Sequence, residues 1–166
     1  MIQEKTVQHP ASGEQLVGVI PDVVRTRNWL GTDQFNVIVT TERMLFIPLR
    51  PVPGGYKALE KYIGLPAEEI LAENKKSIAI EKGEIKSVDY KEGSSYVDCC
   101  RKVMELDGEL EIHTSKGKYT LTVPFRRNNI AKDVLEKAGL PSLKIVKPNS
   151  ESEASHSETG GSCCSQ

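Results

Sequence analysis

The stretch ELEIHTSKGKYTLTVPF, from Glu109 to Phe125, decides the fold of this chain. Apolar and polar residues alternate on both sides of SKGK, a turn that contains glycine. This pattern predicts two antiparallel strands joined as a β-hairpin, with one face buried and the other exposed. The chain is therefore expected to contain a β-rich core.

Helical spacing follows this hairpin directly. Apolar residues recur at positions 130, 131, 134, 135 and 138, which places them in one stripe. Asn128 or Asn129 is a candidate N-cap, and Gly139 followed by Pro141 ends the pattern. Because the stripe needs a sheet to cover it, we expect this helix to plug the open end of a small barrel.

Five further strands are predicted upstream. The segment Gln15–Thr26 is rich in β-branched residues and is interrupted by Pro21, which suits an edge strand or a bent one. Residues 35–40 alternate, and Met44–Leu49 is an almost continuous apolar run, as expected of a strand covered on both faces. SIAIEKGEIKSVDY, Ser77–Tyr90, predicts two more strands around the turn EKGE.

Two stretches interrupt these strands. Residues 50–76 form an expected insertion, because PVPGG crowds strand breakers together and LPAEEILAENKKS predicts a short helix over Pro66–Asn74. Residues 91–107 have no clear period, and we expect a long loop or an irregular strand there.

The phrase IVTTERMLFI, Ile38–Ile47, resembles the strand–turn–strand pairing of bacterial and archaeal pleckstrin-homology (PH) domains and of the related GRAM domains. SIAIEKGEIKSVDY is similar to their next block, and the resemblance covers about Leu16–Leu140 apart from the insertion. It implies a mainly β (α+β) fold, namely a seven-stranded antiparallel PH-like barrel capped by a C-terminal helix, with a short helical insertion. It implies little about the ligand, because this fold hosts unrelated functions.

The length of 166 residues suits one domain and a tail. We expect a flexible N-terminus over 1–13, a PH- or GRAM-like domain over 14–147 with its insertion at about 50–76, and a disordered, acidic, serine-rich tail over 148–166.

Composition narrows the classes of function. The 22 basic residues are balanced by 23 acidic ones, which argues against a dedicated nucleic-acid binder. No apolar run approaches the roughly 20 residues of a membrane-spanning helix, and the N-terminus lacks a secretory pattern. A cytoplasmic location, possible peripheral attachment to a membrane, and free thiols are expected. The cysteine pairs lack zinc-knuckle spacing, so we expect no metal and no cofactor.

The resemblance directs attention to the loop between the first two strands, VVRTRNWLG. There, Arg25 and Arg27 are candidates for holding lipid phosphates, and Trp29 and Leu30 are candidates for dipping into the membrane interface. The alternative for Trp29 is a residue that packs in the core or in the loop.

The chain ends in GGSCCSQ, which looks like the two-cysteine tails of Rab-type GTPases. Cys163 and Cys164 are therefore candidates for lipidation, and two lipid chains would give stable anchoring. Ser165 departs from the aliphatic residue of a prenylation signal, and the alternative is a pair of unmodified thiols.

Catalysis has little support in the sequence. His113 beside Glu111 reads as a solvated strand residue, and no histidine is placed to orient a nucleophile. Cys99 and Cys100 next to Arg101 could be reactive thiols. The expected function is non-enzymatic binding, first of an anionic membrane surface, alternatively of a peptide or partner protein, and last a thiol-dependent enzyme.

Overall fold

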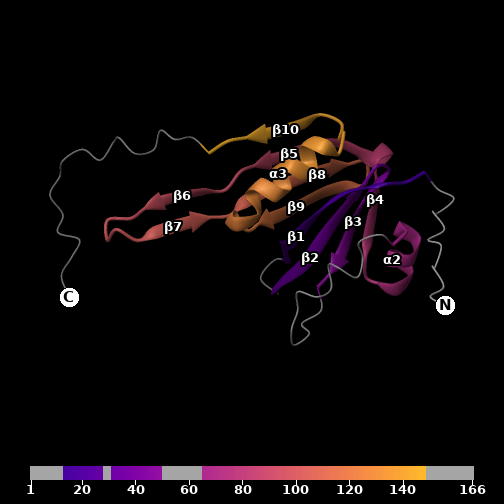
Figure 1. Cartoon of the computed structure of the whole chain (residues 1–166), viewed down its shortest axis with the longest axis horizontal. Coiled ribbons are helices and arrows are strands. Elements are labelled where there is room, and N and C mark those ends of the chain that lie inside the picture. The colour runs from indigo at the N-terminus through magenta and orange to yellow at the C-terminus, as the bar shows by residue number, and fades with distance from the viewer. Residues whose placement is uncertain (1–12, 28–30, 50–64, 149–166) are drawn as a thin grey trace, which may run out of the picture.

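The structure, a computed structural model, describes residues 13–27, 31–49 and 65–148 (Figure 1). The elements are mainly strands, with two α-helices and two short 3-10 turns among the described residues. In chain order they are β1 (Leu16–Arg27), β2 (Gly31–Thr40), β3 (Arg43–Pro48), α2 (Ala67–Glu73), β4 (Ile78–Glu81), η2 (Lys82–Glu84), β5 (Ile85–Lys91), β6 (Ser94–Val97), β7 (Val103–Leu106), β8 (Gly108–Thr114), β9 (Gly117–Val123), η3 (Phe125–Arg127), α3 (Asn128–Lys137) and β10 (Leu143–Val146).

Eight of the strands form one sheet in the order β10-β5-β8-β9-β1-β2-β3-β4. Its two halves, β1 to β4 and β5 with β8 to β10, meet where β1 pairs with β9 at Val24 and Thr122. The register of β1 against β2 shifts between Ile20 and Val23, and Asp22 there has a positive φ of 60°. This irregularity lies next to Pro21, the residue that the sequence marked as an interruption.

The expected seven-stranded barrel is not what the structure contains. The sheet has eight strands and does not close, since β4 and β10 are its two edges within the described part of the chain. The additional strand is β10, which follows α3 and pairs parallel to β5 from Leu143 opposite Val88 to Val146 opposite Lys91. Because β10 occupies that side of β5, the barrel cannot close through a pairing of β5 with β4.

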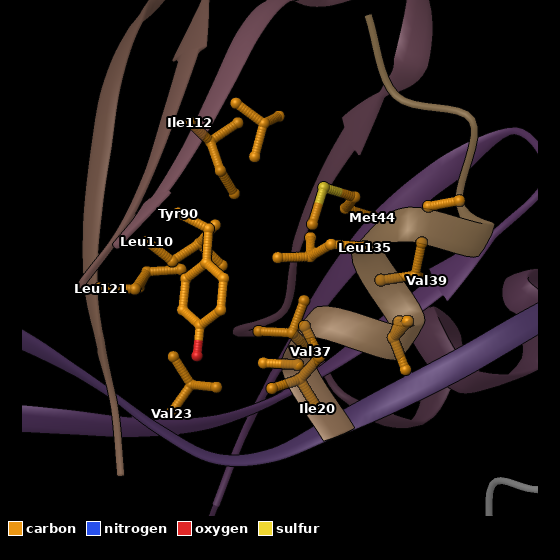
Figure 2. Close-up of a cluster of buried hydrophobic side chains, with 14 of the residues drawn as sticks. Ile20, Val23, Val37, Val39, Met44, Tyr90, Leu110, Ile112, Leu121 and Leu135 are labelled. Atoms are coloured by element: carbon orange, nitrogen blue, oxygen red, sulfur yellow. The ribbon is translucent and has the colours of Figure 1, made fainter. Parts of the chain in front are cut away.

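The main core lies between the two halves of the sheet and α3. Figure 2 shows Tyr90 and Leu110 on one side of this core, and Ile20, Val37 and Leu135 of the helix facing them from the other. The predicted helix is thus confirmed, with Ala131, Val134, Leu135 and Ala138 buried. Ile130, which the pattern placed in the same stripe, is 39% exposed, so the buried stripe is narrower than expected.

Both ends of α3 are tied to the sheet. At its start, Arg127 donates to the carboxylate of Asp22 in the irregular part of β1, with an Nη2 to Oδ2 distance of 2.8 Å. At its end, the Nζ of Lys82 donates to the carbonyl oxygen of Ala138, and burial lowers the pKa of Lys82. These contacts fix the helix over the core.

A second, smaller core lies on the outer side of the N-terminal half. Ala67 and Ile70 of α2 pack against Ile38, Leu45 and Ile47. The predicted short helix is confirmed, and so is the prediction that the apolar run of β3 is covered on both faces.

Residues 91–107 were expected to form a long loop or an irregular strand, and the long loop is wrong. Residues 94–106 form a two-stranded antiparallel hairpin, β6–β7, which pairs with neither edge of the main sheet. In Figure 1 it projects from the body beside α3 and β9.

Candidate functional site

Arg25 is the one predicted phosphate-binding side chain that the structure describes. It lies near the end of β1, half-buried, with its guanidinium carbon 5.4 Å from the ring centroid of Tyr119 on β9. The ring of Tyr119 in turn meets Phe46 edge-on, with centroids 5.7 Å apart. Arg25 is therefore stacked on the sheet by a cation–π contact.

The other predicted residues cannot be placed. Arg27 is described only as the last residue of β1, opposite Gly31. Trp29 and Leu30 lie outside the described residues, as do Cys163 and Cys164, the expected insertion between 50 and 64, and nearly all of the expected N-terminal and C-terminal tails.

Arg43, in the stretch IVTTERMLFI that resembles PH and GRAM domains, has a structural role. Arg43 bridges three carboxylates, with its Nη2 at 3.0 Å from Glu14 and 2.9 Å from Glu68, and its Nη1 at 3.7 Å from Glu81. Burial opposes the charge, but these acids outweigh it and raise the pKa of Arg43. The hydroxyl of Thr40 accepts the N–H of Arg43 and fixes the turn. This arginine is committed to holding strands together.

The hairpin β6–β7 brings apolar side chains to the surface. Directly opposed residues of an antiparallel pair share a face, so the register places Tyr96 and Met104 on one face and Val97 and Val103 on the other. Their exposed fractions are 44%, 42%, 59% and 67%. The outer end of the hairpin is thus apolar on both faces.

A turn ordered by Asp98 closes this end. The Oδ1 of Asp98 accepts the backbone N–H of Cys100 at 2.9 Å and of Lys102 at 2.8 Å, and the N–H of Asp98 donates to the carbonyl of Lys102 at 2.9 Å. Arg101 adopts a positive φ of 59° within the turn. The exposed cations Arg101 and Lys102 stand at the tip, and the carboxylate of Asp98 is used inside the turn.

The base of the hairpin is anchored to the body. The side chain of Asn128, at the start of α3, accepts from the hydroxyl of Tyr90 at 2.8 Å and from the N–H of Gly93 at 3.2 Å, and it donates to the carbonyl of Gly93 at 3.1 Å. Asn128 or Asn129 was expected to be the N-cap, but the N-cap is Arg127 and Asn128 is the first residue of the helix. The side chain of Asn128 instead joins β5, the hairpin and α3.

Cys99 and Cys100 are exposed in the same turn, with their sulfur atoms 3.9 Å apart. The sequence placed them beside Arg101 but gave no indication that they lie at the tip of a projecting hairpin.

A cluster that the sequence did not predict lies on the outward face of the sheet. Asp89 of β5 and Glu111 of β8 are opposed in register, and the Nε2 of His113 lies 3.5 Å from the Oδ2 of Asp89 and 3.6 Å from the Oε2 of Glu111. Glu111 also accepts from the Nζ of Lys118, and this hydrogen bond is the main reason that the pKa of Glu111 is lowered. The spacing of Glu111 and His113, two residues apart on one strand, could have indicated that they share a face. The contribution of Asp89 could be found only from the pairing of β5 with β8.

Comparisons with known proteins give similar solved structures but no family. No protein-family model and no curated protein matches this sequence. The C-terminal domain of an unknown protein from Leishmania infantum is similar with a TM-score of 0.40 and 16% identity, over 76% of this chain and 85% of that one. The hSac2 domain from the human phosphoinositide phosphatase Sac2 is similar with a TM-score of 0.44 and 9% identity, over 93% of this chain and 88% of that one. Likenesses at this level establish neither a family nor a function for the chain.

Within the described residues, neither helix has the length and apolar character needed to cross a membrane.

Proposed function

We propose that this chain is a non-enzymatic binding domain that associates peripherally with an anionic membrane surface through the outer end of the β6–β7 hairpin. The observation that carries the proposal is the pair of exposed apolar faces at that end, Tyr96 with Met104 and Val97 with Val103, next to the cations of the turn.

The exposure of both faces favours a membrane over a flat protein surface. A partner protein that covers one face would leave the other in water, whereas the headgroup and upper acyl region of a bilayer surrounds an inserted tip. Two-stranded hairpins are at best marginally stable alone in water. Burial of the exposed valine, tyrosine and methionine side chains in the membrane interface would be favourable, because it removes apolar surface from water.

Charge at the tip suits the same surface. Arg101 and Lys102 are exposed, and each cation near an anionic leaflet contributes about 1 kcal/mol. Their long side chains can reach the headgroups while neighbouring apolar side chains sit deeper. The base of the hairpin, fixed through Asn128 and Gly93, would hold this tip at a defined angle to the body.

The loop residues Arg25, Arg27, Trp29 and Leu30 stay in the proposal as a second contact with the membrane, and Cys163 and Cys164 as candidate lipidation sites. Arg25 is only partly buried where it stacks on Tyr119, so hydrogen bonding to a phosphate is compatible with the stacking.

Sedimentation with vesicles tests the proposal. The full chain is mixed with phosphatidylcholine vesicles that do or do not contain phosphatidylserine, at low and at raised salt. We expect binding that needs the anionic lipid and weakens with salt. Val97→Ser with Val103→Ser, and separately Arg101→Ala with Lys102→Ala, should each reduce the bound fraction severalfold.

Two controls make the test specific. Ile130→Ser removes an exposed apolar side chain from α3 and should leave binding unchanged. Arg25→Ala with Arg27→Ala separates the loop from the hairpin. Unchanged sedimentation of both hairpin variants would overturn the hairpin as the contact, and loss of binding in the loop variant alone would assign the contact to the loop.

A second candidate function is the binding of a peptide by strand addition. The free edge of β10 adjoins a groove of about 330 Å³ that is lined in part by Lys91, Asp107, Val146 and Lys147. An extended peptide could pair with such an edge and place a side chain in the groove. Partner binding that is indifferent to lipid, and that is lost in a Val146→Asp variant, would favour this function over the membrane.

The proposal gives Cys99 and Cys100 no catalytic role. Labelling of their thiols near neutral pH should then be no faster than that of a cysteine in a free peptide.

A further inference from the structure

Asp89, Glu111 and His113 form a cluster that the paired strands β5 and β8 hold in place. All three residues lie on the outward face of paired central strands, and each is only partly exposed. Their neighbours along the strands, among them Val88, Tyr90, Leu110 and Ile112, are buried in the main core and hold the backbone in position. Side chains that project from such strands are well placed for coordination.

The distances between the polar atoms suit a metal ion better than hydrogen bonds. The separations from the Nε2 of His113 are 3.5 Å and 3.6 Å, and one ligand atom from each residue lies within 4.8 Å of the other two. Hydrogen bonds of this type are usually about 2.7–3.2 Å long. Ligands of a tetrahedral zinc ion, each about 2.0–2.2 Å from the metal, are separated by roughly 3.4 Å.

Lys118 supports Glu111 without occupying the atom that faces the histidine. Its Nζ pairs with Oε1, whereas Oε2 is the atom that approaches His113. Carboxylates that bind metals are typically held by such a neighbouring group, which orients them and keeps them ionised. Two further cations lie on this face: Lys144 of β10 is opposite Asp89 in register, and Lys91 of β5 is opposite Glu109 of β8, which adds a further carboxylate.

We propose that Asp89, Glu111 and His113 bind a divalent transition-metal ion, with zinc as the reference ion and water completing the coordination. One imidazole nitrogen and two carboxylate oxygens are ligands that zinc accepts, and three protein ligands leave a fourth position open. The alternative is that no metal binds and that the three side chains form ion pairs, with a charged His113 between the two acids.

The four cysteines would compete for zinc, so the experiment removes them first. The parent protein is the full chain with Cys99, Cys100, Cys163 and Cys164 changed to serine, and Zn²⁺ alone is titrated into it by isothermal calorimetry near neutral pH. We expect one equivalent to bind and the melting temperature to rise with zinc concentration, since an ion that binds only the folded state stabilises it.

The ligand variants are His113→Asn, Asp89→Asn and Glu111→Gln. Loss of one ligand should weaken binding about tenfold or more, because loss of even an outer-shell group costs about that much. His156→Asn and Asp133→Asn are matched controls outside the cluster, and both should bind as the parent does. Circular dichroism of each variant without metal checks that the fold is retained.

Two results would overturn the site. One is the absence of zinc binding by the parent. The other is equal zinc affinity in the parent and in His113→Asn, which would place the bound ion elsewhere.

Discussion

β3 and the β6–β7 hairpin both contain apolar strand residues, but those of β3 are buried and those of the hairpin are exposed to solvent. Met44, Leu45, Phe46 and Ile47 of β3 are at most 2% exposed, whereas the four apolar residues at the outer end of the hairpin are 42–67% exposed. β3 lies between β2 and β4, with the main core on one face and α2 on the other. Among the described strands, β6 and β7 pair only with each other. Apolar strand residues are therefore a stabilising core in one place and, we propose, a binding surface in the other.

The largest expected effect tests the buried side of this comparison. Phe46→Ala should lower the free energy of unfolding by about 3–5 kcal/mol, because it leaves a cavity where the ring now packs between Phe35 and Tyr119. Urea denaturation followed by circular dichroism measures it. A loss below about 1 kcal/mol would mean that β3 is not packed as described.

The next effect concerns the junction between hairpin and body. A Cβ on Gly93 would lie 2.2 Å from the carbonyl oxygen of Leu106, so Gly93→Ala should cost about 3 kcal/mol or release the hairpin from its anchor. Gly83→Ala is the matched control, because a Cβ there meets nothing within 4 Å. Hydrogen exchange of the hairpin amides should rise in the first variant and not in the second; equal exchange in both would show that the junction is not tight.

The same junction should be sensitive to alkaline pH. Burial, with a smaller contribution from Glu92, raises the pKa of Tyr90 to about 12 from 10.0. The folded state thus holds this proton more tightly, so its contribution is complete below about pH 10 and is lost as the pH rises towards 12, on the order of 2 kcal/mol. Tyr90→Phe should cost about 1 kcal/mol at neutral pH and should flatten this alkaline loss. Denaturation curves between pH 8 and 12 that have the same slope in both proteins would contradict it.

The smallest expected effect tests the exposed side. Val97→Ser with Val103→Ser should change the free energy of unfolding by less than about 0.5 kcal/mol, since both side chains are mostly in water. The same urea experiment measures it. A loss of 2 kcal/mol or more would show that the hairpin packs against a part of the protein, and would weaken its proposed role at a membrane.

Local patterns identified most of the elements. The continuous apolar run at 44–49 predicted a doubly covered strand, and α2 supplies the second cover. The hairpin was missed because its apolar residues fall on both faces, so YVDCCRKVMEL has no period that indicates a buried side. β10 was missed because four residues after Pro141 are too short a signal. Of the candidate site residues, Arg25 is placed at the end of β1, and the membrane role assigned to it stays a prediction.

The sequence by itself determined seven of the strands (β1 to β5, β8 and β9) and the two helices, because each depends on side-chain periods and breakers within about ten residues. Only the tertiary structure decided that β10 pairs with β5, that Asn128 joins the hairpin to α3, and that Asp89 meets His113. Those contacts link residues that are 24 to 55 positions apart (Asp89 and His113, Val88 and Leu143). They depend on how the whole sheet is ordered and registered, which no local pattern specifies.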